Sequence, residues 1–220
     1  MISDLHVNNE LEPLSPQETV GEALAKMNSL HLDLLPLVDG QQLVNYISIY
    51  DLEKVDQEAN LSSLPLFAPV LPYVNRMQHL LNALSHLKTL NLSLLAVLDE
   101  NGHYFGILRT RDVVMALSRS LSVRAIGSII VLRVKPVDYS LSDISRIIEY
   151  SDAKILGFLT FEVEGSSEIE LHLKLNTTAL KHVLATLERY DYRVIQYFNR
   201  EDLIDDTDSR YENLMKYMDI

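Results

Sequence analysis

The sequence predicts a mixed fold in which a pair of α/β repeats precedes a small α+β domain. The 220-residue chain is 47% hydrophobic and 23% charged, which is typical of globular proteins. Its first half matches itself at a shift of about 60 residues, and its second half follows another order of strands and helices. We expect a repeat pair over residues 1–124, with repeat 1 at about 1–60 and repeat 2 at about 66–122, then a second domain over 125–200 and a tail over 201–220.

The internal repeat is visible both in residue identities and in the order of the predicted elements. Leu30 to Leu35 lie over Leu90 to Leu95, and Asp39 lies over Asp99. Each copy has an amphipathic helix, an apolar strand that ends in a turn, and a second strand that leads straight into a helix. One copy is too small to close a core, so we expect the two to pack against each other. The apolar stripe of the first helix is Val20, Leu24, Met27 and Leu30 in repeat 1 and Leu80, Leu84, Leu87 and Leu90 in repeat 2. The predicted strands are Leu34 to Val38, Leu43 to Ile47, Leu94 to Leu98 and Tyr104 to Leu108, and the second helices start near Asp51 and Asp112. The linker between the repeats holds Pro65, Pro69 and Pro72, which favour an extended crossover.

The second domain is predicted as a ferredoxin-like βαββαβ sheet with its helices on one face. β-branched runs and alternating patterns indicate its strands, and helical spacing indicates its two helices. We expect Asn176-Thr177-Thr178 to cap the second of these helices. The strands are Ser128 to Lys135, Ile155 to Val163, Ile169 to Leu175 and Tyr192 to Tyr197, and the helices are Leu141 to Tyr150 and the segment that reaches Tyr190.

Residues 201–220 form a strongly acidic tail. They hold seven acidic and two basic residues, a net charge of −5, which predicts a solvated segment. Tyr211, Leu214, Met215 and Met218 also follow helical spacing, so an amphipathic helix that docks on the domain or on a partner is a second reading.

The strand-to-helix junctions of the two copies resemble those of the CBS-domain family, whose βαββα repeats often carry Gly, two apolar residues, Ser or Thr, two further residues and Asp. Repeat 1 reads Asn45-Tyr46-Ile47-Ser48-Ile49-Tyr50-Asp51, which has the Ser and the Asp but not the Gly. Repeat 2 reads Gly106-Ile107-Leu108-Arg109-Thr110-Arg111-Asp112, which has the Gly and the Asp but not the hydroxyl residue. The resemblance implies a regulatory pair that binds AMP, ADP, ATP or S-adenosylmethionine between its repeats.

The same resemblance implies roles for residues at these junctions. A helix N-terminus presents free N–H groups to phosphate, and a neighbouring carboxylate can accept hydrogen bonds from a ribose diol. Asp51 and Asp112 would bind ribose, Ser48 would donate to phosphate, Arg109, Thr110 and Arg111 would serve the second site, and Leu14, Leu35 and Pro36 would line the adenine slot. Ordinary helix capping explains the Ser48–Asp51 and Thr110–Asp112 pairs as well, so one working site is favoured over two.

The second domain resembles ACT domains, small sensors that commonly dimerise and bind amino acids at the interface. Its first turn contains Asp138 and Ser140 but not the family's glycine. A ligand-free dimerisation or relay domain is therefore the favoured interpretation. Together the two domains resemble bacterial acetoin-utilisation-type regulatory proteins.

Charge and composition argue against several classes of protein. The net charge of −12 opposes nucleic acid and anionic lipid, no apolar stretch approaches the length of a membrane span, and the N-terminal residues do not resemble a signal peptide. With no cysteine, no catalytic motif and no metal-binding histidine pair, we expect a cytoplasmic, non-catalytic protein with no metal. The two family resemblances imply a homodimer and a regulated protein partner. A ligand-free scaffold with degenerate sites is the alternative.

Overall fold

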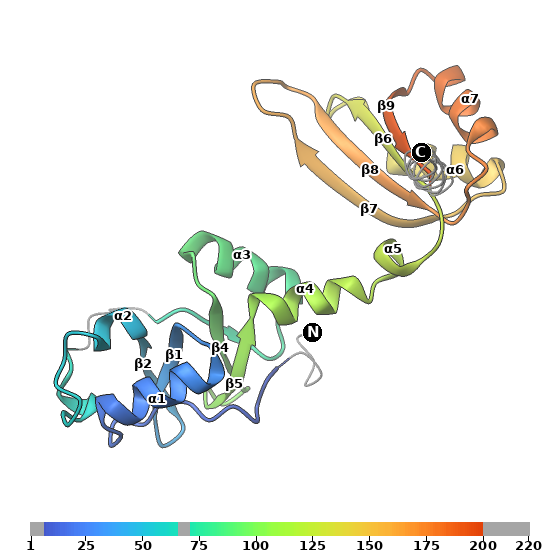
Figure 1. Ribbon diagram of the computed structural model, residues 1–220. Helices are drawn as coiled ribbons and strands as arrows, with labels where there is room; N and C mark the ends of the chain where they lie inside the picture. The colour runs from blue at the N-terminus through green and yellow to red at the C-terminus, as the bar shows by residue number, and fades with distance from the viewer. Residues whose placement is uncertain (1–6, 66–70, 200–220) are drawn as a thin grey trace, which may run out of the picture. The chain divides into compact units, whose positions relative to one another are not determined.

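The computed structural model describes residues 7–65 and 71–199. The chain divides into two compact units, one that ends at Leu117 and one that begins at Ser118. The mixed α/β and α+β class predicted from the sequence is confirmed, and Figure 1 shows the elements of each unit in chain order. The predicted acidic tail lies outside the described residues.

Repeat 1 is a two-stranded antiparallel sheet flanked by two helices. Its elements are α1 (Val20–Leu30), β1 (Leu34–Asp39), β2 (Gln42–Ser48) and α2 (Ile49–Leu52), followed by a 3₁₀ turn at Leu61–Ser63. The strands pair in a hairpin that turns at Gly40, whose φ of 58° suits a residue without a side chain. Helix α1 presents Val20, Ala23 and Met27 to the core, so Val20 and Met27 of the predicted stripe are buried, whereas Leu24 is only partly buried and Leu30 is exposed.

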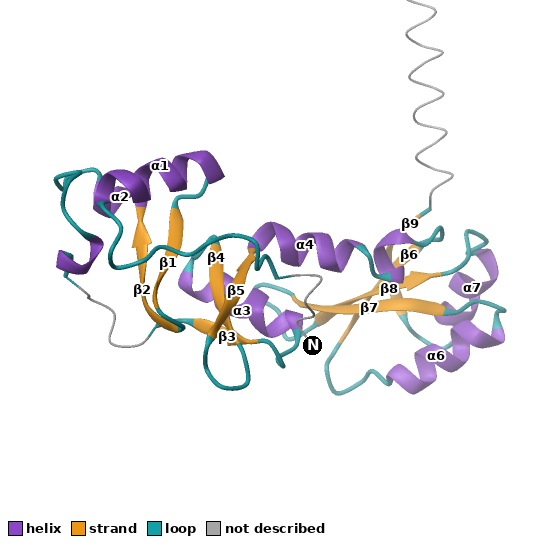
Figure 2. Ribbon diagram, turned by 90° about the horizontal axis from the view of Figure 1, so that it is seen from below, coloured by secondary structure: helices purple, strands orange, loops and turns teal. Residues whose placement is uncertain are grey.

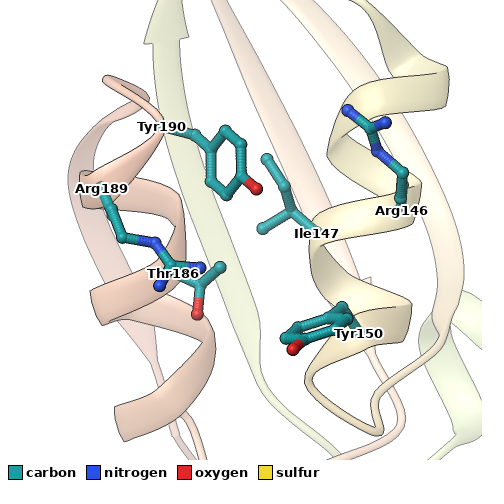
Figure 3. Close-up of a pocket in the computed structure, with 6 residues that line it drawn as sticks. All are labelled: Arg146, Ile147, Tyr150, Thr186, Arg189 and Tyr190. Atoms are coloured by element: carbon teal, nitrogen blue, oxygen red, sulfur yellow. The ribbon is translucent and has the colours of Figure 1, made fainter.

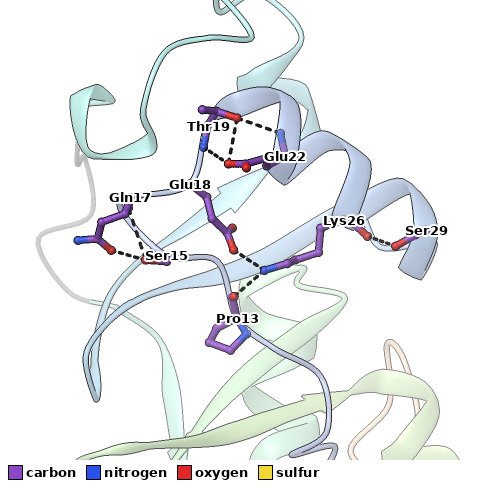
Figure 4. A network of polar contacts seen from close by, with 8 residues as sticks. All are labelled: Pro13, Ser15, Gln17, Glu18, Thr19, Glu22, Lys26 and Ser29. Atoms are coloured by element: carbon purple, nitrogen blue, oxygen red, sulfur yellow. Dashed lines mark hydrogen bonds and ion pairs between the residues drawn. The ribbon is translucent and has the colours of Figure 1, made fainter.

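A polar network fixes the start of α1 (Figure 4). The hydroxyl of Thr19 accepts a hydrogen bond from the Glu22 N–H at 3.2 Å, and the Glu22 carboxylate accepts one from the Thr19 N–H at 2.8 Å. This capping box satisfies N–H groups that have no partner within the helix. Lys26 adds an ion pair with Glu18 at 2.6 Å and donates to the Pro13 carbonyl at 3.1 Å, so the helix holds the chain segment that precedes it.

Repeat 2 has the same order of elements with one strand more. It contains β3 (Tyr73–Asn75), α3 (Leu80–Leu90), β4 (Leu94–Leu98), β5 (Tyr104–Arg109) and α4 (Thr110–Ser118). β4 pairs antiparallel with β5, as in the hairpin of repeat 1, and parallel with β3. The sequence predicted an extended linker here but not that its end would join the sheet.

The two repeats share one compact unit, and Figure 2 shows their strands beside one another. Leu94 and Ile107 of repeat 2 belong to the hydrophobic cluster of repeat 1, together with Leu35 and Met27. The Tyr104 N–H donates to the Gln41 carbonyl at 2.8 Å, which joins the hairpin of one copy to a strand of the other. The predicted packing of copy on copy is what completes the core of repeat 1.

The second unit is a four-stranded antiparallel sheet in the order β7-β8-β6-β9, the ferredoxin-like arrangement that was predicted. Figure 1 shows α6 and α7 on one face of this sheet, where Ile144, Ile148 and Val183 enter its core. The expected cap of α7 was wrong: the helix begins after Leu180 with no side-chain cap, because Thr177 instead accepts from the Ala179 N–H in a turn. The elements are α5 (Leu121–Arg124), β6 (Ile129–Val134), α6 (Leu141–Tyr150), β7 (Ile155–Glu162), β8 (Ile169–Leu175), α7 (Lys181–Arg189) and β9 (Arg193–Phe198).

The short helix α5 packs against β7 of the same unit. A Cβ atom at Gly157 would lie 2.2 Å from the Ser122 Cβ, so only glycine allows this approach. Within the described ranges, no helix has both the length and the apolar character that crossing a membrane requires.

Candidate functional site

The Ser48–Asp51 pair of repeat 1 lies where β2 runs into α2, as the sequence predicted. The Asp51 Oδ2 accepts from the Ser48 N–H at 3.2 Å, and the Ser48 Oγ accepts from the Tyr50 N–H at 3.3 Å. These contacts form a capping box, so the structural role foreseen for the pair is present. They leave the Asp51 Oδ1 and the Ser48 O–H without a partner among the described residues, and Asp51 is exposed.

A cavity of about 500 Å³, which we call the repeat-1 cavity, opens beside Asp51. Its volume lies in the range of small-molecule sites. One wall is β2, and the opposite wall is the segment that folds back after α2. The lining residues are Asn45, Tyr46, Ile47, Asp51, Val55, Leu64 and Pro65. A carboxylate, an amide and a phenol ring thus meet an apolar wall, the mixture of groups that small-molecule pockets use.

Asn45 is a buried amide in the wall of this cavity. Only 9% of the residue is exposed, and its side chain has no hydrogen-bond partner in the part of the chain that the structure describes. Its amide atoms are not fully buried, so they face the open cavity. Asn45 stands at the place of the signature's glycine, a departure that the sequence shows, although its burial and its missing partner could not be read from the sequence.

Tyr46 connects the cavity wall to repeat 2. Its hydroxyl accepts from the Ala96 N–H at 2.8 Å and donates to the Pro72 carbonyl. Burial of the phenol raises the pKa of Tyr46 to about 12. Burial also raises the pKa of Tyr104, whose hydroxyl has no hydrogen-bond partner among the described residues.

The matching junction of repeat 2 is closed on itself. The Arg109 guanidinium grips both oxygens of Asp112, with Nε to Oδ2 at 2.8 Å and Nη2 to Oδ1 at 2.9 Å, and the Arg109 N–H adds a third bond to Oδ2 at 3.1 Å. The side-chain hydrogen bonds that Arg109 donates to Asp112 raise the pKa of Arg109 above its ordinary value. Thr110 donates to the Ser93 carbonyl at 3.2 Å, and Arg111 is exposed. The two residues expected to bind ribose and phosphate here bind each other.

The predicted adenine slot residues lie in the interior. Leu14 and Leu35 have no exposed surface and belong to the core of repeat 1. Pro36 is also buried, and its carbonyl accepts from the Leu14 N–H at 2.9 Å. None of the three lines the repeat-1 cavity. Val55 and Leu64 form its apolar wall instead.

In the second unit, Asp138 is exposed and Ser140 caps α6, its Oγ accepting from the Asp143 N–H at 3.3 Å. A pocket of about 330 Å³ lies between α6 and α7, and it contains neither residue (Figure 3). Two arginines and two tyrosines face this pocket, and Tyr190 is 52% exposed. The pocket residues are Arg146, Ile147, Tyr150, Thr186, Arg189 and Tyr190.

Across residues 7–65 and 71–199, no three histidine or acidic side chains gather closely enough to hold a metal ion. His103 lies 3.7 Å from Asp99 and His172 lies 3.6 Å from Glu170, each as a single pair. The described part of the chain therefore offers no set of ligands on which metal chemistry could be argued.

Two copies of a strand–turn–strand unit, each ending in a helix with a capping aspartate in its first turn, define a tandem α/β module. The family model of the CBS domain matches residues 2–58 and 67–119, which together are half of the chain, and the protein belongs to the CBS-domain family. CBS domains are generally regulatory modules. No curated protein sequence matches the chain.

Several solved structures are similar to this protein. A CBS domain pair/ACT domain protein from Thermotoga maritima has 19% identity and a TM-score of 0.47, and the match covers 53% of this chain and 96% of that one. CBSX2 in complex with AMP has 25% identity and a TM-score of 0.45, with 53% and 94% covered. The cytosolic domain of the Mg²⁺ channel MgtE in complex with ATP has 21% identity and a TM-score of 0.43, with 50% covered here and 46%, less than half, of that chain.

Proposed function

We propose that this protein is a non-catalytic regulator that senses an adenosine-type nucleotide in the repeat-1 cavity. The observation that carries the proposal is the cavity itself: about 500 Å³ of space bordered by a signature aspartate that its own helix engages through one oxygen only. AMP, ADP, ATP and S-adenosylmethionine are the candidate ligands, since all four present the same adenosine group.

The free groups at the junction match the parts of such a ligand. The unused Oδ1 of Asp51 can accept from a ribose hydroxyl, and charge strengthens that bond. The Ser48 hydroxyl, which already accepts from Tyr50, still has its proton to donate to a phosphate oxygen. Val55 and Leu64 supply the apolar surface that a base requires.

Binding would be relayed through Tyr46. Its ring lines the cavity while its hydroxyl holds Ala96 and Pro72, so a ligand that moves Tyr46 changes the contact between the repeats. The shift can be no larger than the ligand's difference in affinity for the two arrangements. We place the readout in a homodimer, with the second unit as its dimerisation or relay domain and a regulated protein as its partner in the cytoplasm.

The test is a thermal-shift series of the whole chain with AMP, ADP, ATP, S-adenosylmethionine and NAD. A ligand at a hundred times its Kd stabilises by about 2.7 kcal/mol, which raises Tm by about 5–10 °C in a chain of this size. Asp51→Ala should abolish the shift, and the control Glu53→Ala, an exposed carboxylate beside the same helix, should leave it. No shift with any of these compounds defeats the proposal.

The second candidate is a ligand-free scaffold, which the Arg109–Asp112 pair favours because it fills one of the two expected sites. Light scattering separates the readings when it is combined with the ligand series. A dimer that shows no thermal shift with any ligand supports the scaffold. A monomer at micromolar concentration contradicts the homodimer that both proposals include.

A further inference from the structure

We propose that Asn45 reads the base of the bound nucleotide, and that it does so through the paired donor and acceptor on the edge of adenine. This inference rests on the proposed function, because it assigns a specificity residue within the repeat-1 cavity. It concerns a position where this chain departs from the signature of its family, with an amide in place of the glycine.

The first step is the burial of the amide. Asn45 is 9% exposed, its neighbour on the same face of β2 is the buried Ile47, and both line the cavity. The ladder with β1 uses the backbone of Asn45 opposite Leu37, but nothing described binds the side chain. The amide thus presents a donor and an acceptor in the wall of an open cavity, where a partner from outside the protein can bind both.

The second step is the chemistry of a carboxamide. It offers one N–H face and one C=O face in a plane, which matches the amino group and ring nitrogen of adenine in a bidentate pair. Guanine presents two acceptors on the corresponding edge and is matched by arginine instead. The repeat-1 cavity therefore selects adenine over guanine and over a purine that lacks the amino group.

The third step is the matching position of repeat 2, which shows that the fold itself does not need an amide there. A Cβ at Gly106 would lie 2.8 Å from the Asn8 carbonyl oxygen and from Val7, so that junction is covered by the N-terminal segment. In repeat 1 the equivalent space is the cavity. The cavity has room for the amide of Asn45, and no described residue hydrogen-bonds to it, so its partner would be a ligand.

The experiment is a calorimetric titration of the whole chain with AMP, GMP and purine riboside monophosphate, for the wild type and for Asn45→Leu and Asn45→Asp. We expect the wild type to prefer AMP by about 5- to 100-fold over the other two, as one bidentate contact discriminates. Asn45→Leu should reduce this preference to less than about 3-fold, while Asp51 preserves measurable binding. Asn82→Asp, an exposed position on α3, is the control for the added charge and should keep the full preference.

The outcomes distinguish the two proposals. If the wild type binds AMP and Asn45→Leu keeps the same preference, the assignment of Asn45 is wrong and the sensor stands. If the wild type binds none of the three, both are wrong. Thermal denaturation without ligand checks that the variant folds: Asn45→Leu should match or exceed the wild-type Tm, because no hydrogen bond is lost, and a fall of more than about 5 °C would show that the amide has a structural partner and overturn the inference.

Discussion

Repeat 1 and repeat 2 share the order helix, strand, strand, helix, and three of the differences between their strand-to-helix junctions set the two sites apart. Where repeat 1 has Asn45, repeat 2 has a glycine that the N-terminal segment covers. Where repeat 1 has Tyr46, repeat 2 has a buried isoleucine, and where it has Ser48, repeat 2 has an arginine bound to its own aspartate. The same order of elements thus gives an open junction in repeat 1 and a closed one in repeat 2, where the N-terminal segment and the Arg109–Asp112 ion pair close it.

The largest effect should come from forcing a side chain into the closed junction. Gly106→Val places a Cβ 2.8 Å from the Asn8 carbonyl oxygen, and we expect it to lower the free energy of unfolding by about 2–3 kcal/mol through overpacking. Urea denaturation followed by circular dichroism measures this loss. Asn45→Val is the matched control in repeat 1, where a Cβ already exists. Equal losses at both positions would show that the junctions do not differ as described.

Removal of the Tyr46 hydroxyl should cost about 2 kcal/mol, since it leaves the Ala96 N–H and the Pro72 carbonyl without their partner. The control is Tyr50→Phe, because Tyr50 is 68% exposed. Thermal or urea denaturation at neutral pH gives both values. If Tyr46→Phe costs no more stability than Tyr50→Phe, the Tyr46 hydroxyl does not bridge the Ala96 N–H and the Pro72 carbonyl.

The pH dependence of stability gives a second check on the same tyrosine. Its pKa is raised from 10.0 to about 12 in the folded protein, so between these values the unfolded chain loses a proton that the folded chain keeps. Ionisation of Tyr46 does not affect the free energy of unfolding below pH 10, and it should lower that free energy by about 2–3 kcal/mol as the pH rises to 12. Tyr46→Phe should flatten this slope, leaving the part due to Tyr104. An unchanged slope contradicts the burial of the phenol.

Arg109→Ser should release the Asp112 carboxylate in repeat 2. Loss of the forked ion pair, whose side chains are 20% and 17% exposed, should cost about 1–2 kcal/mol, a value reduced by the solvent that still reaches it. Calorimetry with AMP should still give one site per chain, because the N-terminal segment covers this junction at Gly106. Arg111→Ser, which removes an exposed arginine two residues away, should leave both stability and stoichiometry unchanged. A stoichiometry of two in Arg109→Ser would mean that the ion pair alone closes repeat 2.

The smallest difference should lie in the first helices. Thr19→Ala removes the capping box of α1 and should cost about 1 kcal/mol. The corresponding helix α3 has only a single bond, from the Leu81 N–H to the His79 ring at 3.2 Å, so His79→Ala should cost less. Differential scanning calorimetry resolves the two. The reverse order would show that the network around Thr19 is not stabilising.

The elements that the sequence predicted best are those with long periodic patterns. Helix α3 and strand β4 span the predicted residues, because the helix buries an apolar stripe and all five residues of the strand are buried. Strand β3 was not foreseen, since three residues show no period and their partner, Ala96 to Leu98, lies more than twenty residues away. The start of α7 was misplaced because Thr177 has a turn within reach that uses the same hydroxyl.

Only the site residues whose positions are set by neighbouring residues in the sequence could be predicted. The Ser48–Asp51 pair follows from a strand that leads directly into a helix, and the structure places it there. Val55 and Leu64 reach the cavity because the chain folds back after α2, a tertiary event without a local pattern. The ion pair between Arg109 and Asp112 was not predicted either, because the arginine was interpreted as a phosphate-binding residue.

The placement of Leu94 and Ile107 in the core of repeat 1 has a consequence for how the protein is made. When residues up to the linker have left the ribosome, repeat 1 lacks part of its interior and cannot complete its packing. Domains generally fold as units during synthesis, so this unit must wait until the second hairpin has emerged. The two repeats therefore form a single folding unit, and we expect repeat 1 alone not to fold once repeat 2 is deleted.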